Sequence, residues 1–296
     1  MGREHAVRDF LRARRAAVSP GDVGLPHAPG ARRVPGLRRE EVASLAGVSV
    51  DYYTRLEQGR ALNVSDSVLR AIARALRLDE EEVAHLRDLV GPSAGAPRAS
   101  GRATQGIRPG VAQLLATMES LPAYVLGWRG EVLAANRLAR ALFTDFEAMP
   151  APQRNLVRWL CTDPTARELF LDWEDVAADA VAALHRQVGK DACDPLIAAL
   201  VGELSVVSEE FARWWASQRV FSRTHGVRRL RHPLVGRLDL AVEHLLVPGP
   251  LEQALVVHSA EPGSASAEAL GLLASWTAPG RGATPQEAER GSRLEG

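Results

Sequence analysis

The chain has 296 residues, of which 46% are hydrophobic and 24% are charged, and its formal net charge is zero. This length allows two domains, and the composition excludes a wholly disordered chain. The two cysteines, Cys161 and Cys193, have neither the number nor the spacing of a disulfide framework or a metal site. Because the sequence has no apolar signal region and no run of about 18 apolar residues, we expect a cytoplasmic protein without a membrane partner.

The first 60 residues are more basic than the whole chain, with eleven arginines against seven acidic residues. Such a bias suits a surface that faces phosphate.

His5–Val18 is predicted to be the first helix, because apolar side chains recur at helical spacing and Ser19-Pro20 follows. The next segment, 21–36, is rich in Pro and Gly. Two interpretations of it stay open: phosphate contacts from Arg32 and Arg33, or a disordered insertion.

Residues 37–59, LRREEVASLAGVSVDYYTRLEQG, are predicted to form two short helices joined by a tight turn at Gly47. The apolar positions of the first helix are Leu37, Val42, Leu45 and Ala46. Ser49 is predicted to cap the second helix, whose Tyr53 and Leu56 share one face. The other face carries polar and aromatic side chains, which is typical of a helix that enters the major groove of DNA. An ordinary helical hairpin is the alternative.

This run resembles the Cro/CI-type (XRE) helix-turn-helix family in the acidic pair Glu40-Glu41, the turn Ala46–Ser49 and the motif Leu56–Gly59. The resemblance implies a λ-repressor-like, all-α head that binds double-stranded DNA. It also implies an ion pair between Arg15 and Glu57, for which two unrelated surface charges are the alternative. The residues expected to contact DNA are Arg39, Ser49, Val50, Asp51, Tyr52, Thr54 and Arg55.

Two further helices are predicted to complete a five-helix head over residues 1–90. The fourth follows a Ser65 cap, and the fifth begins at Asp79 with Glu82 in a capping-box position. Residues 91–106 are rich in Gly, Ala, Ser and Pro and are predicted to be a linker. The polar residues 277–296 are predicted to be a disordered tail.

Residues 107–276 have the pattern of an α+β domain. Ala123–Asn136 is predicted to be a hairpin around Arg129-Gly130. Helices are predicted at 137–143, 153–161, 164–170, 173–187, 195–207 and 209–218, and strands at 226–231, 237–247 and 254–259. This is more apolar helix than one layer over a sheet needs. We therefore predict an internal apolar cavity, bounded by the hairpin, the late strands and the helices that carry Trp159 and Trp214.

This second region resembles the ligand-binding domain of MmyB-like transcription regulators. The matching segments are Ala123–Gly127, Arg154-Asn155, Asp163-Pro164, Asp172-Trp173-Glu174, Ser208–Phe211, Trp214-Trp215, His232-Pro233 and Ala260–Ser264. The resemblance implies a PAS-like fold with an internal cavity and a fatty-acid-like ligand. The chain departs from the family pattern at Ala135, where Trp is frequent, and at His258, where an aromatic residue is frequent, so the family's ligand does not transfer directly.

The candidate ligand-binding residues are Arg154, Asn155, Arg158, Trp159, Trp214 and His232. Polar groups beside an aromatic ring suit the carboxylate of an amphiphile whose chain lies among apolar side chains. The alternative is a helix cap and a surface arginine for the first three, and core packing for the tryptophans. Residues 213–237 contain seven arginines and no acid, which fits a phosphate-contacting, partner or head-group surface, or a solvated strand edge balanced by acids elsewhere.

The sequence contains no Gly-rich phosphate loop, no nucleophile elbow and no His-Glu-x-x-His motif, so we expect no catalytic residues, cofactor or metal. It predicts a homodimeric transcription regulator in which a ligand changes how two heads fit two half-sites. One alternative is a C-terminal domain that serves dimerisation or protein interaction without a small ligand. An enzyme with a DNA-targeting head is the other, and it lacks a catalytic constellation.

Overall fold

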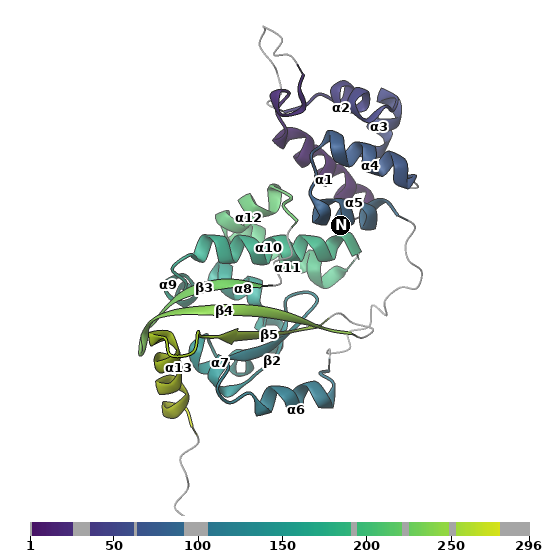
Figure 1. The fold of residues 1–296 in the computed structure, drawn as a ribbon. Helices are drawn as coiled ribbons and strands as arrows, with labels where there is room; N and C mark the ends of the chain where they lie inside the picture. Colours follow the sequence, from purple (N-terminus) through teal and green to yellow (C-terminus); the bar gives the residue numbers. More distant parts are fainter. Residues whose placement is uncertain are drawn as a thin grey trace, which may run out of the picture.

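A helical head and an α+β C-terminal domain follow one another along the chain (Figure 1). The structure, a computed structural model, describes residues 2–25, 36–61, 64–91, 106–190, 194–220, 225–248 and 253–278. Three predictions lie wholly or mostly outside these ranges: phosphate contacts from Arg32 and Arg33, the linker over 91–106, and the disordered tail over 277–296.

Five α-helices make up the described part of the head. They are α1 (Arg3–Ala17), α2 (Arg39–Ala46), α3 (Val50–Glu57), α4 (Asp66–Ala75) and α5 (Glu80–Val90), with a short 3-10 turn, η1, at Gly21–Val23. The predicted caps are confirmed: the Ser49 hydroxyl accepts a hydrogen bond from the Tyr52 N–H at 3.1 Å, and Asp79 and Glu82 form a capping box. These local hydrogen bonds fix where the helices begin.

The turn between α2 and α3 and the turn after α3 both require glycine. Gly47 has a φ of +65°, and Gly59 has a φ of +75°. A Cβ at Gly59 would lie 2.5 Å from the Cα of Glu4, so the close approach of α1 also excludes a side chain there. The prediction that Tyr53 and Leu56 are buried is confirmed. Leu45 is exposed, however, because it lies on the outer face of α2.

Glu57 is a buried carboxylate at the end of α3, with 1% of its side chain exposed. Arg15 Nε lies 2.8 Å from Glu57 Oε2, and an Arg39 guanidinium nitrogen lies 2.7 Å from Oε1. The predicted pairing of Arg15 with Glu57 is confirmed. Burial alone would raise the pKa of the Glu57 carboxyl, but the hydrogen bonds and charges of the two arginines outweigh it and hold the pKa below its usual value.

The C-terminal domain is built on a five-stranded antiparallel sheet with the order β2-β1-β5-β4-β3. The strands are β1 (Ala123–Gly127), β2 (Val132–Ala135), β3 (His225–His232), β4 (Gly236–Val247) and β5 (Gln253–Ser259). The predicted hairpin and late strands are therefore confirmed, with ends that differ by a residue or two. Side chains on one face of the sheet pack beneath α6, while the opposite face packs against the long helical segment between β2 and β3.

The described helices of this domain are α6 (Pro109–Thr117), α7 (Arg137–Leu142), α8 (Leu156–Thr162), α9 (Pro164–Leu169), α10 (Trp173–Lys190), α11 (Pro195–Val207), α12 (Glu209–Ala216) and α13 (Ala265–Trp276), with 3-10 turns η2 (Phe146–Ala148) and η3 (Ala151–Gln153). The sequence patterns did not indicate α13. Figure 1 shows α10 lying between the sheet and the head.

The head packs on α10 through α5 and α1. His85 on α5 and His185 on α10 are both 3% exposed. The ring of His85 meets Phe10 edge-on at 5.0 Å, and His185 stacks on Trp215 at 3.6 Å. Arg14 on α1 pairs with Glu82 and also donates a hydrogen bond to the Ser217 carbonyl. The buried apolar residues of the head and of α10–α12 thereby form one continuous cluster.

The first prediction concerns the buried ion pair. The substitution Glu57→Gln leaves Arg15 without its charge partner in a site that is only 12% exposed. We expect the free energy of unfolding to fall by about 3–5 kcal/mol, measured by urea denaturation. Asp66→Asn is the control, because Asp66 pairs with Arg70 and Arg87 at the surface and should cost less than about 1 kcal/mol. Equal losses in the two variants would contradict the structural role of Glu57.

The second prediction concerns acid stability. Burial, with the charges of His185, Arg186 and Arg14, lowers the pKa of His85 to about 3, and burial lowers the pKa of His185 to about 4. In the unfolded chain a histidine has a pKa of about 6.5. The unfolded state therefore binds more protons below this pH, and stability should fall as the pH drops from about 6.5 toward 4.

Thermal or urea unfolding at a series of pH values tests this expectation. Each of the two histidines should contribute up to about 1.4 kcal/mol per pH unit within that window. The double substitution His85→Gln, His185→Gln should flatten the dependence, whereas His5→Gln, at an exposed position on α1, should not. An unchanged slope in the double variant would show that other groups cause the acid sensitivity.

Candidate DNA interface and ligand cavity

The outer face of α3 is formed by residues predicted to contact DNA. Val50 is 45% exposed, Asp51 and Arg55 are also exposed, and Tyr52 and Thr54 are half-buried. Ser49 caps the helix from an exposed position. The structure thus brings six of the seven predicted residues together at one end and face of α3. Such a face can reach base edges while the opposite face packs in the head.

Arg39, the seventh residue, lies at the start of α2. Its side chain is 46% exposed, and its guanidinium is bound to Glu57. Arg39 therefore has a structural contact that sequence reasoning did not assign to it. The same contact fixes α2 relative to α3.

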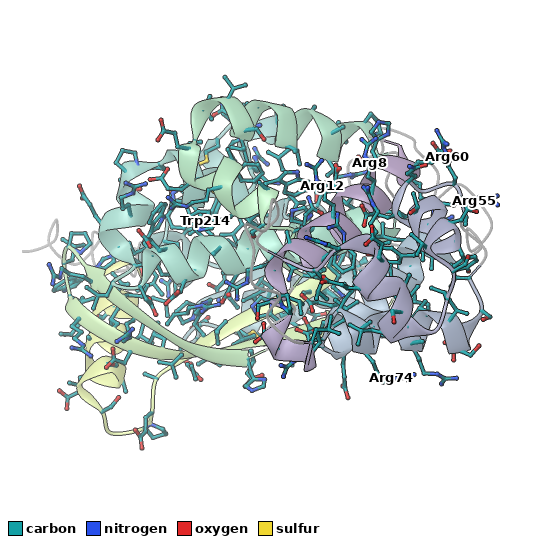
Figure 2. All side chains as sticks on the ribbon, turned by 90° about the horizontal axis from the view of Figure 1, so that it is seen from above. Arg8, Arg12, Arg55, Arg60, Arg74 and Trp214 are labelled. Carbon is teal, nitrogen blue, oxygen red and sulfur yellow. The ribbon has the colours of Figure 1, made fainter. Side chains whose placement is uncertain are left out.

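Arg60 is a further cation near this face. Its backbone N–H donates to the Arg55 carbonyl at 2.8 Å, and its residue is exposed. Figure 2 shows Arg55 and Arg60 projecting from the head on the side away from the C-terminal domain, whereas Arg74 projects elsewhere. Arg60 was not among the residues predicted to contact DNA, although its position directly after Leu56–Gly59 is a signal that could have indicated it.

A cavity of about 540 Å³ lies between α10 and the inner face of the sheet. Its volume is within the range of small-molecule sites. Apolar side chains dominate its lining, including Leu126, Leu156, Val157, Leu160, Phe170, Val176, Ala180, Ala183, Leu184, Val242 and Leu246. The predicted cavity is confirmed, with walls from the hairpin, the late strands and the helix that carries Trp159. The prediction was wrong for the helix of Trp214, since α10 forms that wall.

The polar lining on the sheet side carries little net charge. A guanidinium nitrogen of Arg228 on β3 lies 3.5 Å from Asp179 Oδ2 on α10. Burial lowers the pKa of His244 to about 4, and burial, His244 and Arg228 lower that of His258 to about 3. Both imidazoles are therefore neutral at pH 7. Burial also raises the pKa of the Tyr124 hydroxyl.

Apart from Asp179 Oδ2, which lies beside Arg228, three buried polar atoms of the lining have no hydrogen-bond partner among the described residues: Trp128 Nε1, Gln187 Oε1 and His258 Nδ1. Buried polar groups in native proteins are nearly always hydrogen-bonded. An indole donor, an amide acceptor and an imidazole nitrogen are thus left for a molecule inside the cavity. Arg186, which also lines it, adds a positive charge to the same wall.

None of the six predicted ligand-binding residues lines this cavity. Arg154 donates to the carbonyls of Met149 and Glu147. Asn155 caps α8, and its amide donates to the Arg129 carbonyl at 3.0 Å. Arg158 forms an ion pair with Glu203 on α11. The alternative reading of a helix cap and surface arginines therefore describes this segment.

The other three predicted residues are structural as well. Trp159 packs in the core between Phe146 and Phe170. Trp214 lies 5.5 Å from the ring of Trp173, and His232 Nε2 lies 3.1 Å from the Ala141 carbonyl. The cavity residues that sequence reasoning missed are on α10 and β3. The sequence did contain a signal for Arg228. It lies in the basic run 213–237, and a surface that binds a ligand head group was one interpretation of that run.

Two further arginines of this basic run lie beside acids. Arg229 lies 3.6 Å from Asp172, and Arg237 lies 3.2 Å from Asp239.

Burial raises the pKa of the Cys161 thiol to about 12, so it is not a thiolate nucleophile at neutral pH. Within the described ranges, no group of His, Cys, Asp and Glu side chains has the arrangement of a metal site. None of the described helices is both long and apolar enough to cross a membrane.

Comparison with known protein families supports both resemblances seen in the sequence. The model of the MmyB-like transcription regulator ligand binding domain matches residues 107–273, and the model of a helix-turn-helix domain matches residues 6–86. No curated protein matches the chain. Because the first match spans more than half of the chain, the protein belongs to the family of MmyB-like transcription regulators, with a helix-turn-helix domain ahead of its ligand-binding domain.

Proposed function

We propose that this regulator reads double-stranded DNA with α3 and binds an apolar or amphipathic small molecule in the cavity beneath α10. The observation that carries the proposal is the cavity itself, in a domain of a ligand-binding family, where Trp128 Nε1 and Gln187 Oε1 have no hydrogen-bond partner among the described residues. The matched families are those of regulator domains rather than enzymes, which agrees with the catalytic motifs missing from the sequence.

For DNA, the proposal assigns base contacts to the outer face of α3. Arg55 has the fork of donors that recognises guanine, and Asp51 would accept a hydrogen bond from a cytosine amino group. Tyr52, Thr54 and Val50 would contact neighbouring base edges, where Val50 suits a thymine methyl. Ser49, Arg39 and Arg60 lie at the margin of this face and would contact phosphate.

For the ligand, the proposal rests on the shape and chemistry of the cavity. The lining residues of α10 run from Val176 to Gln187, a length of about 16 Å along the helix. An elongated apolar body fits this wall. A head group that accepts from Trp128 and donates to Gln187 would satisfy these two atoms, and Arg186 on the same wall would favour an acidic one. A fatty-acid-like molecule has these properties when it carries a hydroxyl group or keeps its carboxyl proton, because an ionised carboxylate only accepts.

The proposal includes a homodimer, because helix-turn-helix regulators generally bind two half-sites as dimers. Exposed apolar side chains support it: Leu196 and Val206 on α11 are 52% and 86% exposed. A C-terminal domain that only dimerises is the competing function. It would leave the unpaired polar atoms of the cavity without an explanation.

The third prediction tests the DNA face. Arg55→Ala should weaken binding to the selected operator by about 1–3 kcal/mol, because a bidentate contact to a base is lost. The operator is first obtained by sequencing DNA retained by the purified protein, and affinities are then measured by fluorescence anisotropy. Arg74→Ala is the matched control, since Arg74 projects from α4 in another direction. Equal affinities for wild type and Arg55→Ala would contradict the placement of α3.

The fourth prediction tests the cavity. A fatty acid at a hundredfold excess over its Kd should stabilise the protein by about 2.7 kcal/mol, seen as a rise in Tm. Ala180→Phe fills part of the cavity from the α10 wall and should abolish the rise. Asp175→Ala changes an exposed residue of the same helix and should preserve it. If a series of fatty acids gave no shift with wild-type protein, the dimerisation function would be favoured.

A further inference from the structure

One helix, α10, touches both the cavity and the DNA-binding head. Ala180 and Ala183 line the cavity, whereas His185 lies on the side that faces the head, near His85. Leu184 belongs to both sets, because it lines the cavity and is part of the hydrophobic cluster shared with the head. No loop intervenes between the two surfaces, so a displacement of α10 alters both (Figure 1).

The contact with the head has the burial of a protein core. His85 and His185 face each other closely enough for the charge of one to influence the other, and both are 3% exposed. Phe10 packs on His85, and Trp215 packs on His185. The bond from Arg14 to the Ser217 carbonyl closes the edge of this contact. A head held in this way has one orientation relative to the C-terminal domain.

A charge also connects the two surfaces. Arg186 lines the cavity, and its charge acts on His85 of the head. A ligand head group that binds Arg186 would therefore change the potential at the contact with the head.

We propose that ligand binding in the cavity and docking of the head on α10 are positively coupled. The proposal rests on the proposed ligand-binding function. An unfilled cavity leaves one side of α10 with few packing partners, so the position of the helix is less restrained. A ligand supplies packing partners for α10 on the side of the cavity, and the docked head supplies packing partners on the opposite side. Because both stabilise the same position of α10, each raises the affinity for the other.

The consequence for DNA binding follows from geometry. In the docked state α3 lies on the far side of the head from α10 (Figure 1), so docking leaves its outer face accessible. Fixed heads on a dimer have one separation, and they match one spacing of half-sites. The ligand would thus act by fixing the spacing of the recognition helices, with no direct contact to DNA.

The first test measures dodecanoate affinity by calorimetry in three full-length variants. His185→Arg and His85→Arg place a permanent charge in the buried contact, one from each side, and neither residue lines the cavity. Both should weaken dodecanoate binding about fivefold or more, the usual size of such coupling. Arg87→Ala is the control, because Arg87 is on α5 but pairs with Asp66 inside the head, and it should bind dodecanoate like wild type.

The second test needs no ligand. Ala183→Leu adds side-chain atoms to the cavity wall of α10 and should slow hydrogen exchange of the α5 amides, whereas His185→Arg should speed it. Equal dodecanoate affinities in wild type and both histidine variants, or α5 exchange that Ala183→Leu leaves unchanged, would overturn the coupling. If wild-type protein does not bind dodecanoate, the proposed ligand class fails, and the exchange of α5 decides the coupling by itself.

Discussion

The packing of α10 on two sides is the constraint on which the rest of the structure depends. Toward the sheet the helix presents short side chains, Ala180 and Ala183, which leave space that the facing strands do not fill. Toward the head it presents His185, which is buried. Protein interiors are otherwise closely packed. The cavity therefore exists because the alanine side chains of α10 are too short to fill the space between the helix and the sheet. A larger residue at either position would replace the cavity with core.

Within the head, a charge takes the place that an apolar residue would have in most cores. Desolvation of Glu57 costs free energy that is recovered only because Arg15 and Arg39 approach from α1 and α2. These two contacts tie α3 to both preceding helices at the end opposite its cap. The orientation of the recognition face thus depends on ion pairs behind it. For this reason the guanidinium of Arg39, a residue predicted to contact DNA, is bound to Glu57 within the head.

Local signals account for what the sequence predicted correctly. Caps at Ser49 and Asp79, the Gly47 turn and the strand predicted at 237–247 all depend on neighbouring residues, and each lies where it was expected. The cavity residues depend on which face of α10 meets the sheet, and residues distant in sequence decide that. The pair Arg154-Asn155 does not line the cavity, and its local pattern suits a helix cap and a ligand clamp equally well. In α13 the apolar residues are not confined to one face, so periodicity gave no signal.

The charge balance of the cavity indicates where ligand selectivity arises. Asp179 neutralises Arg228 on the sheet side, and burial keeps His244 and His258 uncharged at pH 7. Apolar walls discriminate weakly, by about 10- to 200-fold for each methylene of a ligand. Unpaired buried polar atoms discriminate much more strongly, because a ligand that does not satisfy them leaves their desolvation uncompensated. We therefore expect hydrogen bonds to Trp128 and Gln187 to distinguish one amphiphile from another. The length of the cavity wall formed by α10 limits the length of the apolar chain that fits.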